Sequence, residues 1–243
     1  MNDTLALVMA EISRVRRNRR YLVFTVALPV VLYLLFSKQG KGSLANGLPF
    51  ATWYMVAMAT FGAVSGAFNN NAIRISQERK GGWIRQLRLT PLPAYSYMIA
   101  KVVASMATSV PAIAIVMILG SAYGGVNMPI WEWIVTAVAI WLGTLIFAAL
   151  AVAVGYRVDP DSAQPVAMIV FFVLMILGGV LIPVSGGLKD IAKFSPTYQV
   201  MQICTDVIKN GNFAAINVAG VFIWLAIFAA LATFTVRSSA ETV

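Results

Sequence analysis

Long apolar runs alternate with short polar segments along this chain, and the runs determine the expected fold. Six runs are candidates for membrane-spanning helices: residues 21–36, 50–68, 98–119, 131–154, 166–183 and 214–236. Runs of this length suit helical spans and are too long for the strands of a membrane barrel. The sequence therefore predicts an all-α integral membrane protein with six transmembrane helices. We expect one domain over residues 1–243, with the six-span bundle at 21–236.

The first run is the shortest of the six. At about 1.5 Å per residue, residues 21–36 would cover about 24 Å, which is less than the roughly 30 Å of bilayer hydrocarbon. Arg20 and Lys38 would then have to extend to the membrane surfaces, or the bilayer would have to thin locally. Pro29 lies inside this run and predicts a kink.

Residues 1–20 precede the first run and have an amphipathic pattern. Apolar positions recur at helical spacing at Leu5, Val8, Ile12 and Val15. The opposite arc carries Glu11, Arg14, Arg17 and Asn18. This pattern predicts a helix along the inner membrane surface. Two interpretations stay open: a positively charged topology anchor that attracts anionic lipid, or a helix that also contacts a partner.

The segment between the fifth and sixth runs is long and only partly apolar. Its first part, PVSGGLKD, is typical of turns, whereas PTYQVMQICTDVIKNGN predicts a helix that begins at Pro196 and ends at Asn210–Gly211. This helix is too polar to cross a membrane. We expect short external re-entrant or interfacial helices here, and a plain extracellular loop is the alternative.

Composition and charge support a membrane protein and indicate its orientation. The chain is 60% hydrophobic and 11% charged, which excludes an ordinary soluble domain. Its net charge of +9 would suggest nucleic acid in a soluble protein, but here no nucleic-acid partner is expected. Of the 18 Lys and Arg residues, all but five fall on the side that holds both termini. The positive-inside rule then predicts that both termini, including a short tail at 237–243, lie in the cytoplasm. We expect a multi-pass protein of the plasma membrane.

Several chemistries are not supported by the sequence. There is no phosphate-binding loop, since the nearest match, KQGKGS at 38–43, lacks the spacing, so the chain cannot hydrolyse ATP alone. No carboxylate falls in the middle of a predicted span, which disfavours ion-driven transport and intramembrane proteolysis. With no histidine and one cysteine, Cys204, neither a metal site nor an internal disulfide is expected. We predict no catalytic residue.

One basic segment, ERKGGWIRQLRLTPLP at 78–93, lies between the second and third runs. Ser76 could cap a short helix, Gly81–Gly82 would break it, and the residues from Trp83 could resume it with an apolar stripe. Pro91 and Pro93 would end it. The pattern predicts a short amphipathic helix at the cytoplasmic surface. An inert basic surface helix is the alternative.

This segment resembles that of the permease subunits of type-2 ABC transporters. The resemblance rests on Glu78 followed by basic residues and Gly81, then LRLTPLP at 87–93, then a span with Lys101 near its start. It extends over nearly the whole chain, through the basic N-terminal helix, the six spans, a polar loop RVDPDSAQP at 157–165 and FSPTYQVMQICTDVI before the last span.

The resemblance implies a function. The segment between spans two and three would be a coupling helix that docks on a separate ATPase subunit, with the N-terminal helix beside it. The implied coupling residues are Glu78, Arg79, Gly81, Arg85 and Leu87. Two permease copies, as a homodimer or a heterodimer, would pair with two ATP-binding subunits, which would hold ATP and magnesium, whereas this chain binds no cofactor.

The implied cargo is an amphipathic drug, antibiotic or lipid-like molecule that is expelled outward, as in multidrug efflux and antibiotic resistance. The path would be lined from the second and fifth spans by Met55, Met58, Phe61, Phe68, Phe171, Phe172 and Met175. The alternative from another class is a non-transporting membrane scaffold that recruits a partner through its basic cytoplasmic face.

Overall fold

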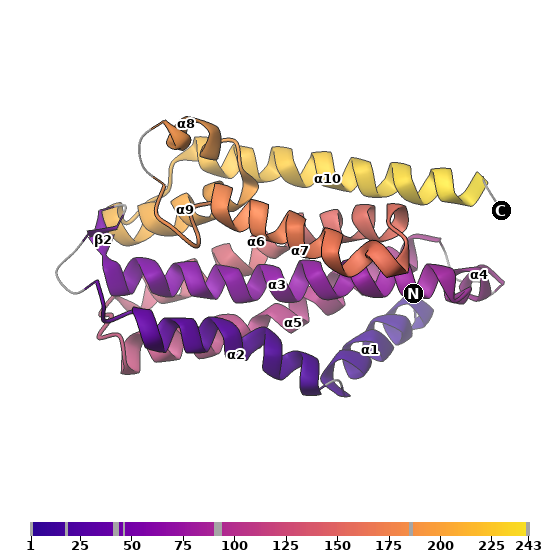
Figure 1. Cartoon of the computed structure of the whole chain (residues 1–243), viewed down its shortest axis with the longest axis horizontal. Helices are drawn as coiled ribbons and strands as arrows, with labels where there is room; N and C mark the ends of the chain where they lie inside the picture. The colour runs from indigo at the N-terminus through magenta and orange to yellow at the C-terminus, as the bar shows by residue number, and fades with distance from the viewer. Residues whose placement is uncertain are drawn as a thin grey trace.

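The computed structural model describes residues 2–17, 19–40, 44–45, 47–89, 94–184 and 187–241, and this part of the chain is almost entirely helical. Five helices are long and apolar enough to cross a membrane. They are α3 (Phe50–Lys80), α5 (Ala94–Ala122), α6 (Ile130–Arg157), α7 (Pro160–Leu177) and α10 (Ala215–Glu241). They form one elongated bundle, with both termini and α4 at one end and α8, α9 and β2 at the other (Figure 1). The prediction of a mostly helical, multi-span membrane bundle is confirmed, with five of the six predicted spans present as long apolar helices.

The first predicted span corresponds to α2 (Arg19–Phe36), whose apolar part, Thr25–Phe36, is shorter than the five spans above. The helix packs against α3 and α5. Pro29 lies inside α2, and a Cβ added at Gly62 of α3 would come within 3.1 Å of its Cγ. Because α2 packs closely along α3, we expect α2 to enter the bilayer. A sixth crossing of the membrane stays a prediction.

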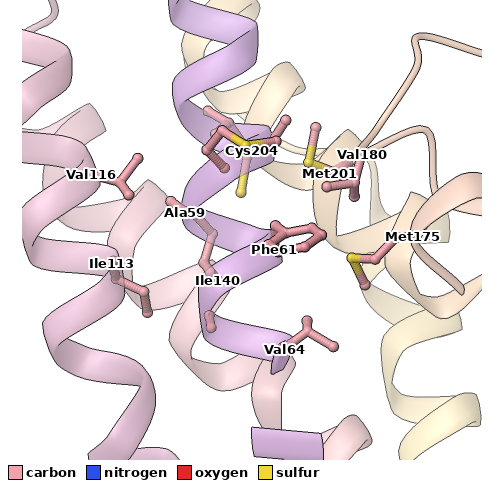
Figure 2. Packing of buried hydrophobic residues seen from close by; sticks show 14 of the residues in the cluster. Ala59, Phe61, Val64, Ile113, Val116, Ile140, Met175, Val180, Met201 and Cys204 are labelled. Carbon is pink, nitrogen blue, oxygen red and sulfur yellow. The ribbon is translucent and has the colours of Figure 1, made fainter. Parts of the chain in front are cut away.

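Helix α3 forms the centre of the bundle. It contacts α2, α5, α6 and α7, and nearly all of its apolar window is buried. Figure 2 shows Ala59, Phe61 and Val64 of α3 among side chains from the surrounding helices. Close approach depends on small residues: a Cβ added at Gly155 of α6 would lie 2.7 Å from Cβ of Ile75. Any movement of α3 must therefore be shared with its neighbours.

Helix α3 also continues 12 residues beyond the predicted span 50–68, as far as Lys80. The predicted helix cap at Ser76 is wrong, because Ser76 lies inside α3. Its side chain is buried and its hydroxyl donates a hydrogen bond to the carbonyl of Val158, at 2.6 Å. The predicted break at Gly81–Gly82 is confirmed, with Gly82 at φ +74°, and α4 (Trp83–Arg88) follows it. Pro91 and Pro93 lie outside the described residues.

Helix α7 begins and ends six residues earlier than the predicted span 166–183. Pro160 is suited to the first turn of a helix, where its missing N–H is not needed, so the polar stretch after Asp159 is already helical. The helix stops at Leu177 because Gly178 and Gly179 follow, and Gly179 adopts a φ of +69°. The predicted polar loop at 157–165 is therefore reduced to a short connection.

The end opposite the termini is closed by small elements. A hairpin pairs β1 (Leu44–Ala45) with β2 (Leu48–Pro49), and α8 (Leu188–Ala192) precedes α9 (Pro196–Asn210). Helix α9 has the predicted bounds and ends at Gly211 with a φ of +69°. It packs on α6 and α10. Whether α9 re-enters the membrane stays a prediction.

Helix α1 (Asn2–Arg17) packs mainly along α5. Its apolar residues Leu5, Met9 and Ile12 are exposed, whereas Glu11 is buried. The amphipathic helix expected at residues 1–20 is present, with a charged residue facing the protein and apolar residues facing outward. This arrangement suits a helix that lies on a membrane surface.

Candidate functional site

A network of charged side chains lies where α1, α3 and α5 meet. Lys101 of α5 is fully buried in the bundle. Its Nζ lies 2.8 Å from Oε2 of Glu78 in α3 and 3.0 Å from Oε2 of Glu11 in α1. A buried ammonium group is tolerated only when it is paired in this way. One lysine thus links an N-terminal helix to two helices of the bundle.

Two arginines and a tyrosine complete this network. Arg74 Nη2 lies 3.1 Å from Oε2 of Glu11 and 3.5 Å from Oε1 of Glu78. Arg14 Nη1 lies 3.2 Å from Oε1 of Glu78. The Tyr97 hydroxyl donates to Oε2 of Glu78 at 2.7 Å. We call these six residues, Glu11, Arg14, Arg74, Glu78, Tyr97 and Lys101, the charge network.

Local sequence features place these side chains. Arg74 and Glu78 are four residues apart in α3, and Tyr97 and Lys101 are four apart in α5, so each pair projects from one helix face. The start of α1 is held to the start of α5 by a hydrogen bond of 2.8 Å between Thr4 Oγ1 and Ser96 Oγ. This contact sets the register that brings Glu11 to Lys101.

A second set of contacts joins the end of α3 to the connection between α6 and α7. Arg79 donates to the carbonyl oxygens of Tyr156 and Val158, the latter at 3.2 Å. Its Nη2 also lies 3.7 Å from Oδ1 of Asp159. Lys80 and Asp161 form an exposed ion pair at 3.3 Å. The last turns of α3 are therefore connected to α1 and α5 on one side and to α6 and α7 on the other.

The predicted coupling residues have different surroundings in the structure. Glu78 and Arg79 face the protein and are engaged in the contacts above, with 13% and 31% of their side chains exposed. Gly81 is exposed in the turn after α3. Arg85 and Leu87 belong to α4, and their side chains lie outside the described part of the chain. Other exposed side chains at this turn are Gln77, Lys80, Trp83, Gln86 and Leu89. Direct docking by the five predicted residues stays a prediction.

The predicted path residues lie mostly inside a single copy of the bundle. Met55, Met58, Phe61, Phe68, Phe171 and Met175 are all buried. Phe61 and Phe171 meet edge to face with ring centroids 4.9 Å apart. Phe172 is 39% exposed, and its ring centroid lies 5.5 Å from that of Phe171. Among the seven, Phe172 is the side chain that faces outward, and their role as a path stays a prediction.

Four members of the charge network are not predicted as site residues from the sequence. Glu11 and Arg14 are expected only on the polar arc of the N-terminal helix, and Arg74 and Tyr97 carry no predicted site role. Two signals were present: Glu11 is one of two acids in a basic helix, and Lys101 is a lone cation near the start of a long apolar run. Their pairing could not be deduced, because it depends on how α1 folds back onto α5.

The described residues offer little other reactive chemistry. They contain no group of three or more His, Cys, Asp or Glu side chains that could hold a metal ion. Cys204 of α9 is buried, and burial raises the pKa of its thiol to about 12. The thiol is therefore protonated at neutral pH and is a poor nucleophile.

This burial predicts that Cys204 resists alkylation in the folded protein. We expect no modification by a maleimide reagent at pH 7 in mild detergent, and full modification after unfolding in dodecyl sulfate, as measured by intact mass. Rapid labelling of the folded protein would contradict the buried position of Cys204.

Comparison with known proteins agrees with this architecture. Residues 38–236, most of the chain, match the family model described as ABC-2 family transporter protein. The chain therefore belongs to the ABC-2 transporter family and is a multi-pass membrane protein with the role of a transport permease. It is also 23% identical over 246 residues to the Bacillus subtilis (strain 168) protein named "Putative transport permease YvfS", and the match covers both chains completely. Glu11 and Arg14 lie before the part of the chain that the family model matches.

Proposed function

We propose that this permease is the transmembrane subunit of an ATP-driven exporter and that it docks on a separate ATPase subunit through the exposed turn between α3 and α5. ATP and magnesium would be bound by that partner. The observation that carries the proposal is the position of the turn: it directly follows the charge network, so a force applied to the turn acts on buried contacts of the bundle.

The proposed coupling uses α3 as a rigid element. Movement of an ATPase subunit displaces α4 and the end of α3. Glu78 transmits the displacement to α5 and α1 through Lys101 and Arg14, and Arg79 transmits it to the α6–α7 connection. Because α3 is packed on all sides, the bundle responds by a rigid-body change between two arrangements rather than by a local deformation.

The proposed assembly contains two permease copies and two ATPase subunits in the plasma membrane, with both termini cytoplasmic. Both termini lie at one end of the bundle together with α4 (Figure 1). The charge network lies where α1, α3 and α5 meet, and this clustering supports the orientation. The proposed cargo is an amphipathic drug, antibiotic or lipid-like molecule. Support comes from the apolar character of α3 and α7 and from the outward position of Phe172.

The docking proposal is tested by co-expressing the permease with an ATPase subunit encoded beside it and purifying the complex in detergent. We expect co-purification and permease-dependent ATP hydrolysis. Failure of a folded permease to bind any such subunit would contradict the proposal and favour a non-transporting scaffold.

Two substitutions in the exposed turn sharpen this test. Lys80→Glu reverses an exposed charge and Leu89→Asp places a charge on a side chain that is 86% exposed. We expect each to weaken co-purification by about tenfold, since a misplaced charge at an interface costs on the order of 1–2 kcal/mol or more. Lys189→Glu, which reverses another exposed charge at the other end of the bundle, is the matched control and should leave binding unchanged. Equal effects of Lys80→Glu and Lys189→Glu would contradict docking at the turn.

A further inference from the structure

An apolar groove lies between α5 and α6, away from the charge network. Its volume is about 230 Å³, and all its lining residues are apolar: Val110, Ile113, Ala114, Met117, Ala137, Val138 and Trp141. Ile113 and Met117 are nearly buried, whereas Val110 and Val138 are about half exposed. The groove is therefore open along one side and closed at its base.

The sequence of α5 explains why the two helices leave space here. The hydroxyls of Ser105, Thr108 and Ser109 each donate to the carbonyl oxygen three residues earlier, at 2.6–2.7 Å. Pro111 follows and has no N–H to donate. Hydroxyl groups that bond back to the helix, together with a proline, favour a local bend in a helix. The groove begins at this segment.

Trp141 of α6 forms one wall of the groove. Its indole N–H donates to the carbonyl of Met106 at 3.1 Å, so the polar atom of this side chain is already satisfied. The side chains of Ala114 and Ala137 are small and leave room beside the ring. The groove consequently presents a hydrocarbon surface with no polar group to hold water.

The groove lies at the depth of the bilayer hydrocarbon. No charged residue occurs in α5 after Lys101 or in α6 between Glu132 and Arg157. The α5 lining residues follow Lys101 by 9 to 16 positions, or about 14–24 Å along the helix. Exposed apolar side chains continue the same surface on both helices: Ile115, Ile118, Ile134 and Leu142. The groove is thus part of a continuous lipid-facing surface.

We propose that this groove binds one acyl chain of a bilayer phospholipid. Water lacks polar partners in the groove, and the exposed isoleucines beside it have the character of a surface in contact with lipid. The bilayer already provides an apolar environment, so the chain gains van der Waals contact with the groove rather than hydrophobic burial. With the orientation proposed above, the chain belongs to the outer leaflet. The binding itself does not depend on an ATPase partner.

The test uses the fluorescence of Trp141 in the purified permease, reconstituted in phosphatidylcholine vesicles with or without bromine in the middle of the acyl chains. Bromine quenches indole emission on contact. The difference in emission between the unsubstituted permease and Trp141→Phe gives the contribution of Trp141. We expect brominated chains to quench this contribution by about twofold or more, and Ala114→Leu, which fills the groove, to remove most of the quenching.

The matched control is Ala107→Leu, since Ala107 is exposed on α5 two turns before Ala114 and outside the groove. It should leave the quenching unchanged. If Ala114→Leu does not fold, Ala137→Leu fills the groove from α6. Absence of quenching in the unsubstituted groove would show that protein, such as a second copy of this chain, covers it. Equal quenching with the groove filled would show contact with ordinary surrounding lipid. Either result overturns the proposal.

Discussion

Replacing Lys101 with methionine is expected to destabilise the permease by about 3–5 kcal/mol, because it removes the buried cation that lies between two carboxylates. Glu11 and Glu78 would keep Arg14 and Arg74 as their cationic partners in the network, and Glu78 would keep the hydrogen bond from Tyr97. A loss of this size corresponds to a fall of roughly 10 °C in the thermal midpoint of a chain of this length. The midpoint is measured in detergent by the loss of the monodisperse peak in size-exclusion chromatography after heating.

Two comparisons make the Lys101 prediction specific. Lys193→Met removes an exposed lysine that is paired with Asp190 at 2.8 Å, and it should not shift the midpoint measurably, because exposed ion pairs contribute little. The double variant Glu11→Gln, Lys101→Met removes one charge of each sign and should recover part of the loss. A Lys101→Met variant as stable as the original protein would contradict the structural role of the buried lysine.

The second large effect is expected for Glu78→Gln in the complex with the ATPase subunit. Glutamine keeps the size of the side chain but loses the charge that holds Lys101, Arg74 and Arg14. Hydrogen bonds to charged groups contribute about 1.5–3 kcal/mol, so we expect permease-dependent ATP hydrolysis to fall by about tenfold or more. Assembly should be retained, since the Glu78 side chain faces the protein and only 13% of it is exposed.

The matched control for Glu78→Gln is Asp161→Asn, which neutralises an acid at the same end of the bundle. The Asp161 side chain is 88% exposed and pairs only with Lys80 among the contacts described above. We expect normal hydrolysis. If Glu78→Gln bound the ATPase subunit and supported unchanged hydrolysis, Glu78 would have no part in coupling.

The sequence was sufficient for the features that depend on local composition. Apolar runs located the five long helices, the glycine pair located the end of α3, and Pro196 and Gly211 bounded α9. Each of these follows from hydropathy or from backbone preferences that a few neighbouring residues determine.

The sequence was insufficient where contacts between distant segments decide the structure. Ser76 has the properties of a helix cap, but packing against the α6–α7 connection keeps it inside α3. Glu78 looked like a surface residue beside other charged residues, yet it faces Lys101, which is 23 residues away, and lies beside α1. Such pairing depends on the helix arrangement, which hydropathy does not encode.

If the charge network acts as one unit, Glu11 and Glu78 are coupled, and a double-mutant cycle on these two residues tests this most directly. Glu11→Gln, Glu78→Gln and the double variant would be compared for permease-dependent ATP hydrolysis in purified complexes with equal subunit content. If both acids act through Lys101, the double variant should lose little more activity than Glu78→Gln alone. Losses that multiply, or no loss in either single variant, would contradict the coupling of α1, α3 and α5 through this network.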